Sequence, residues 1–124
     1  MAITGLQLHV PLDRCWTMAV TVPSGDYTQG QMVKIEDTVC VVVTAGDEGD
    51  NVAVLTRAPM ITVPCAIVTS GAYLVGAKVY FDAADAEVNE SSSGNTLCGT
   101  VIEVGVVGAE EVMIALDGHL GIVA

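Results

Sequence analysis

Short runs of apolar residues, separated by turn-forming residues, recur along the whole chain. Met32–Glu36 alternates between apolar and polar positions, and this period of two is typical of a strand with one buried face. Val112–Leu116 is predicted as the last strand, which Asp117 and Gly118 end. Val39–Thr44 is apolar at nearly every position, which predicts a strand buried on both faces. No stretch shows a convincing helical period. We therefore predict an all-β fold, either a small β-barrel or a β-sandwich.

Other segments complete this set of short strands. Further strands are predicted at 52–56, 61–64, 66–69, 79–82 and 97–104. Pro64 suggests an edge position or a strand end, because proline cannot donate to the strand ladder. The strands at 79–82 and 97–104 are expected to form a hairpin around a polar, serine-rich turn. Residues 70–76 have room for one helical turn.

The N-terminal region differs from the rest of the chain. We predict an extended arm or first strands at 1–22, followed by a barrel or sandwich domain at 23–124. Leu6, Leu8 and Val10 alternate with polar residues, which is a strand pattern.

A second extended run follows at 15–22, after Pro11 ends the first one. It contains Trp16, the only tryptophan of the chain. Tryptophan is favoured both in cores and in contacts between chains, and the pattern does not distinguish these two positions for Trp16.

Composition supports a core built from small side chains. The chain of 124 residues is 52% hydrophobic but only 4% aromatic, and it contains twenty-one valines. β-Branched residues favour pleated sheets, because their side chains are stiff at χ1. Charged residues make up only 15% of the chain, against a usual share of about a quarter. We interpret this low charge as a sign that a partner covers part of the surface.

The charge that is present is strongly acidic. Fifteen acidic residues against four basic ones give a net charge of −11. The bases Arg14, Lys34, Arg57 and Lys78 are scattered singly, which argues against a nucleic-acid or anionic-membrane partner. No apolar run approaches a membrane span, and no signal peptide opens the chain. We therefore expect synthesis in a reducing cytoplasm.

The four cysteines show no metal-binding or redox spacing. Cys15, Cys40, Cys65 and Cys98 form no CxxC pair. In a reducing compartment disulfides are rare, so we expect four small buried apolar side chains. A disulfide framework is the alternative.

Candidate chemistry is sparse, and each instance has a simpler explanation. Residues 46–51 are rich in carboxylates but lack the ligand spacing of a calcium loop, and they favour a solvated turn. Asp82 and Asp85 resemble an acid–base pair, yet aspartate at a strand exit more often bonds its own turn. His9 and His119 lack metal-ligand spacing. We predict no catalytic, cofactor or metal site.

Specific motifs then point to a family. The segment 76–103 resembles a family of small tailed-phage proteins, characterised as capsid cement or decoration proteins. The motifs that carry this resemblance are Gly76, Val79–Asp82, Gly94–Thr96, Gly99 and Val112–Leu116, with Gly30–Val33 and 45–64 upstream. The resemblance covers roughly residues 20–116, and neither 1–22 nor the C-terminal tail matches.

The resemblance implies a non-enzymatic role on the virion. The resemblance implies a β-barrel or β-sandwich fold. It also implies that the protein binds the outer surface of the expanded head as a homotrimer, over the joints between major capsid proteins. An extended arm is able to add a strand to a sheet edge of a partner, so we predict capsid contact for Leu6, Leu8, Val10 and Trp16. The alternative is that these residues form the first strand of the domain itself.

Three other functions stay open at this point. The first is a minor structural protein of the virion, such as a head-fibre base. The second is a small hydrolase that uses Asp82 and Asp85. The third is a ligand-binding barrel, which requires a deep pocket, and pockets are usually lined with aromatic residues, of which this chain has few.

Overall fold

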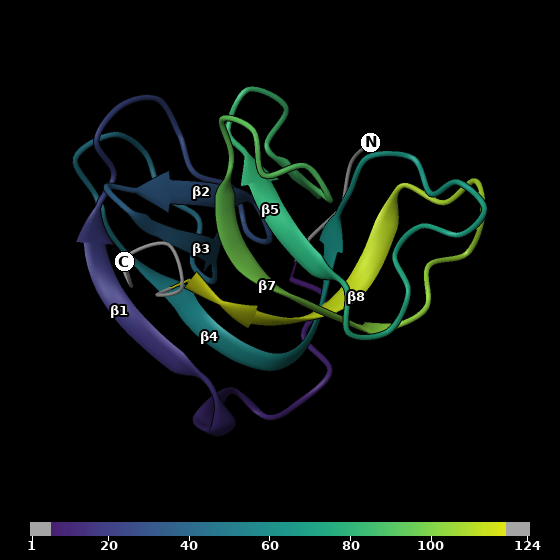
Figure 1. Cartoon of the computed structure of the whole chain (residues 1–124). Helices are drawn as coiled ribbons and strands as arrows, with labels where there is room; N and C mark the ends of the chain where they lie inside the picture. Colours follow the sequence, from purple (N-terminus) through teal and green to yellow (C-terminus); the bar gives the residue numbers. More distant parts are fainter. Residues whose placement is uncertain (1–5, 119–124) are drawn as a thin grey trace.

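The predicted all-β class is confirmed by the computed structural model, which describes residues 6–118 (Figure 1). The strands are β1 (Trp16–Thr21), β2 (Met32–Ile35), β3 (Thr38–Val42), β4 (Asn51–Pro64), β5 (Lys78–Asp82), β6 (Glu87–Asn89), β7 (Thr96–Glu103) and β8 (Glu111–Asp117). A 3₁₀ turn, η1 (Leu12–Arg14), precedes β1, and the described residues contain no α-helix. This range contains no helix that is long and apolar enough to cross a membrane.

The strands form one sheet that curls into a nearly closed barrel. The sheet order is β2-β3-β4-β8-β7-β5-β6, with β1 paired to β4 outside this path. A parallel bridge between Cys65, just after β4, and Val88 of β6 brings the last strand back to β4. In Figure 1, β5, β7 and β8 curve across the front of this barrel, while β1 to β3 extend from one side of it.

Two apolar clusters fill the molecule, and β3 lies between them. Val39 and Val41 belong to the larger cluster inside the barrel, whereas Cys40 and Val42 belong to a smaller one shared with β1, β2 and the first half of β4. All five residues of β3 are buried, as its continuous apolar run predicted. In β8, which is apolar from Val112 to Leu116, every second side chain points into the barrel: Val112, Ile114 and Leu116. Since both clusters consist largely of valine, isoleucine and leucine, a sheet rich in small β-branched residues packs without large rings.

The division of residues 52–69 into three strands was wrong. Asn51–Pro64 is one continuous strand of 14 residues, with a register shift between Ala58 and Ile61. Pro59 lies within this irregular stretch, where its missing N–H costs no regular ladder bond. Pro64 ends the strand, as predicted, but residues 66–69 form a loop.

Two further local predictions needed correction. Residues 6–10 form no regular strand and contribute only an isolated bridge between Leu8 and Ile61. His9 donates its backbone N–H to the Met60 carbonyl at 3.0 Å, so this segment still runs along β4. Residues 70–76 form turns without a helix.

The predicted hairpin contains an extra strand. β5 and β7 pair antiparallel, with Val79 opposite Gly99, as the sequence indicated. The polar segment between them also holds β6, which pairs with the other edge of β5 through a tight turn at 83–86. The alternation is too short in Glu87–Asn89 to reveal this strand without its partner.

The cysteines are free thiols, and three of them are fully buried. Cys40, Cys65 and Cys98 are 0% exposed, which confirms their prediction as core residues, whereas Cys15 is only partly buried. Burial raises the pKa of Cys40 and of Cys98 to about 12, and that of Cys65 to about 11. The thiolate is the reactive form of cysteine. The native fold therefore protects these three side chains in two ways: burial excludes reagents, and the raised pKa keeps the thiols protonated.

Thiol labelling tests this burial. At pH 8 a pKa near 12 leaves about one thiol in ten thousand ionised, against about a quarter for an unfolded cysteine. We expect an alkylating reagent to modify Cys40 and Cys98 at least about a thousandfold more slowly in the folded protein than in denaturant, and Cys65, with its pKa of about 11, at least about a hundredfold more slowly, as read by mass spectrometry. Equal rates in both states would contradict the described packing.

Candidate interaction surfaces

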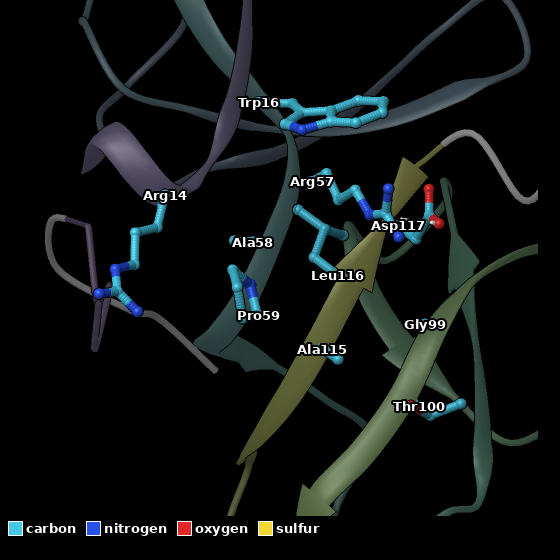
Figure 2. Close-up of a pocket in the computed structure, with 10 residues that line it drawn as sticks. All are labelled: Arg14, Trp16, Arg57, Ala58, Pro59, Gly99, Thr100, Ala115, Leu116 and Asp117. Atoms are coloured by element: carbon cyan, nitrogen blue, oxygen red, sulfur yellow. Dashed lines mark ion pairs between the residues drawn. The ribbon is translucent and has the colours of Figure 1, made fainter. Parts of the chain in front are cut away.

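A groove on the outside of the sheet collects the tryptophan and two arginines (Figure 2). It has a volume of about 490 Å³. The lining residues are Arg14, Trp16, Arg57, Ala58, Pro59, Gly99, Thr100, Ala115, Leu116 and Asp117. The small residues Gly99 and Thr100 of β7 and Ala115 of β8 make up part of its lining, while the larger side chains come from η1, β1, β4 and the end of β8.

The antiparallel pairing of β1 with β4 assembles the cationic side of this groove. It places Trp16 opposite Arg57. The Arg57 guanidinium carbon lies 4.8 Å from the centre of the Trp16 ring, a cation–π contact. Arg57 also faces Asp117 of β8, with 3.7 Å between Nε and Oδ2. The Thr56 hydroxyl donates to the Trp16 carbonyl at 3.4 Å, which ties the start of β1 to β4.

Trp16 is thus placed as a surface residue of the domain and not as part of its core. Its side chain is 56% exposed, although Arg57 covers one region of the ring. In Figure 2, Arg14 lies at the end of the groove opposite to Asp117, and its side chain points away from Trp16. Tryptophan and arginine are the side chains most enriched at the energetic centres of protein interfaces. The groove therefore has the composition of a protein-binding site.

A second surface is made by two loops at one end of the barrel. We call it the apolar loop surface, and it consists of Ile67, Leu74, Val75, Val104, Val106 and Val107. All six side chains are exposed, and Val106 and Val107 reach 72% and 65%. Figure 1 shows the two loops, which follow β4 and β7, together at the right of the view.

Backbone hydrogen bonds hold these two loops against each other. Gly105 donates to the Tyr73 carbonyl at 3.0 Å, and Gly108 donates to the Val68 carbonyl at 2.8 Å. Val68 in turn donates to the Ala109 carbonyl at 2.9 Å. Tyr73 and Val68 are themselves buried in the barrel core, so the loops are anchored from below. The exposed apolar side chains are consequently presented on an ordered base.

The four residues predicted to contact a capsid are not equivalent in the structure. Leu6 and Leu8 are half-buried and pack against the barrel cluster, as a first strand of the domain would do. Val10 is half-buried as well, and only Trp16 is strongly exposed. Their contact with a capsid stays a prediction.

Sequence reasoning missed the convergence of Arg14 and Arg57. We described the four bases as scattered, and along the chain they are, because 42 residues separate these two arginines. Strand pairing brings both to one groove. No local pattern signals this, and only Trp16 drew attention to the region.

The residues weighed for chemistry have local structural roles. The Asp82 carboxylate accepts the Ala84 N–H at 3.1 Å, which confirms the turn interpretation, and Asp50 accepts the Asp47 N–H at 2.9 Å in the loop at 46–51. The His9 ring lies 2.8 Å from the Thr62 hydroxyl, while His119 lies outside the described residues. Within 6–118, no three His, Cys, Asp or Glu side chains are grouped so that they could hold a metal ion.

The comparison with known families found a match. A family model described as phage cement protein matches residues 14–116. The chain belongs to the phage cement protein family. The resemblance noted over 20–116 is therefore confirmed, and the match extends it to Arg14. It thus includes every residue that lines the groove except Asp117. No curated protein and no solved structure is significantly similar to the chain.

The matched range also separates the residues that were predicted to contact the capsid into two groups. Trp16 and both groove arginines lie inside the matched range, whereas Leu6, Leu8 and Val10 precede it. A phage cement protein is a structural component of the phage capsid, which agrees with a chain whose notable features are surfaces and not a reactive centre.

Proposed function

We propose that this cement protein binds the outer surface of the expanded head as a trimer, at three-fold and quasi-three-fold positions. There it stabilises the contacts between major capsid proteins against the pressure of packaged DNA. The observation that carries the proposal, beyond family membership, is the apolar loop surface. Six exposed apolar side chains gather at one end of a domain whose net charge is −11. Exposed apolar patches on soluble domains mark interaction sites.

The apolar loop surface faces the shell in this proposal. Its base is ordered by the hydrogen bonds between the loops, so little conformational entropy is lost when a partner covers it. All six side chains are apolar, so covering them removes no charged group of this surface from water. The acidic remainder of the molecule keeps the free protein soluble before it reaches the head.

Stabilisation then requires no chemistry. A protein that binds the assembled shell and not its separated subunits shifts the equilibrium toward assembly by mass action, by about 2.7 kcal/mol per site at a concentration of one hundred times Kd. Three copies on one trimer add multivalency, because the second and third contacts form at a high effective concentration.

Cryo-electron microscopy of bare expanded heads, with and without the purified protein, tests the proposal. We expect saturable density at the three-fold positions, and decorated heads that withstand a higher temperature than bare heads before they release DNA. Density restricted to one vertex would instead indicate a minor structural protein. An absence of density with folded protein in excess would overturn the cement role at this surface.

A further inference from the structure

The groove and the turn between β5 and β6 carry opposite charge on one chain. Arg14 and Arg57 are two of only four basic residues, and both line the groove. The turn and its flanks contain Asp82, Asp85 and Glu87 within six residues. Among the described residues, no lysine or arginine makes an ion pair with any of these three carboxylates.

The carboxylates of the acidic turn repel one another. Burial raises the pKa of Glu87, the nearby carboxylate of Asp85 raises it further, and the N-terminal ammonium offsets part of this shift. Asp82 uses one oxygen within its own turn, and the Asp85 side chain is exposed. A further cation, supplied by a second copy, would therefore favour the charged form of these carboxylates.

The arrangement of the fold keeps the two features apart within one copy. In Figure 1 the turn between β5 and β6 lies at the top of the view, whereas η1, which carries Arg14, lies at the bottom. A chain cannot place its own acidic turn in its own groove. Two different and complementary surfaces on one chain are what a head-to-tail contact between identical copies requires, and such contacts form a ring when the rotation between neighbouring copies closes.

We propose that the groove lined by Arg14, Trp16 and Arg57 receives the acidic β5–β6 turn of a second copy, and that three such contacts close the trimer. The inference rests on the proposed function only for the number of copies. A groove of about 490 Å³ holds the side chains of a tight turn. The two loops that carry the apolar loop surface lie at a third side of the barrel, away from η1 and the β5–β6 turn, so the contact between copies leaves this surface uncovered.

This arrangement gives Trp16 a partner different from the capsid. Its exposed ring would cover the apolar part of the neighbouring turn, and the arginines would bind the carboxylates, at the centre of a surface from which water is excluded.

A charge-swap experiment tests the contact in the absence of heads. Sedimentation velocity and native mass spectrometry of the full chain would measure the Kd of the trimer for the wild type, Arg14→Glu, Asp85→Arg and the double variant. We expect each single reversal to weaken the trimer at least about tenfold, and the double variant to recover most of this loss. Lys34→Glu makes the same charge change at an exposed position outside the groove and is expected to leave the Kd unchanged.

The other outcomes overturn the inference. A wild-type protein that stays monomeric, a trimer indifferent to both single reversals, or single losses without recovery in the double variant would each exclude this contact. If Arg14→Glu instead weakens binding to heads with the trimer intact, the groove binds an acidic segment of the capsid protein. Because the trimer is measured without heads, failure of this contact is distinguishable from failure of the cement role, in which a folded trimer does not bind heads.

Discussion

Replacing Gly99 with alanine is expected to lower the free energy of unfolding by at least about 4 kcal/mol, most of the stability of a small domain. Gly99 lies in β7 opposite Leu116 of β8. A Cβ atom built on it would collide with the backbone carbonyl of Ala115. Because this obstacle is backbone, no side chain is able to rotate away, and the two strands must separate. Urea unfolding followed by circular dichroism measures the loss.

Two alanine variants separate this steric cost from other effects. Thr100→Ala alters the next residue of the same strand, half-buried and without a tight approach, and is expected to cost less than about 1 kcal/mol. Gly108→Ala tests backbone conformation alone, since φ is +88° and no atom lies within 4 Å of the added Cβ. It should cost about 1–2 kcal/mol. A Gly99→Ala variant as stable as Thr100→Ala would show that β7 and β8 lie further apart than described.

Introducing a carboxylate at Val106 is expected to weaken binding to expanded heads at least about a hundredfold. The Val106 side chain is 72% exposed, in a turn that the Ala109 N–H closes onto the Val106 carbonyl at 2.9 Å. Aspartate is compatible with such a turn, so folding of the free protein should change by less than about 0.5 kcal/mol. On the head, the charge would be buried against the shell without a partner, and this costs several kcal/mol. Titration of bare heads with labelled protein measures the change.

The matched control carries the same new charge on another side of the molecule. Thr44 is exposed in the loop between β3 and β4, far from the apolar loop surface in the fold. Thr44→Asp is therefore expected to bind heads like the wild type. If Val106→Asp also binds normally while remaining a folded trimer, the apolar loop surface does not face the shell.

Sequence prediction succeeded where a short run of residues itself indicates which faces of a strand are buried or which side chain closes a turn. The apolar run that starts at Val39 indicated that both faces of β3 are covered, because side chains of a strand point alternately to its two sides. The role of Asp82 in its own turn was also readable, since an aspartate side chain reaches the backbone N–H two residues later.

The errors occurred where a distant strand determines the local structure. Pro59 interrupts the pattern of β4, yet pairing with β1 and β8 keeps the strand continuous through its irregular region. β6 is only three residues long and exists because β5 offers it an edge. Leu6–Val10 has the alternation of a strand but makes only a single bridge.

The sequence by itself determined the all-β class, the valine-rich core, the buried cysteines and the family, since each depends on residue type and near-neighbour spacing. Only the tertiary structure decided which side chains meet on the surface. Arg14 and Arg57 share a groove because β1 pairs with β4, and the six residues of the apolar loop surface meet because backbone hydrogen bonds join two loops. These proximities depend on strand register and barrel closure, which are set by contacts between residues far apart in the chain.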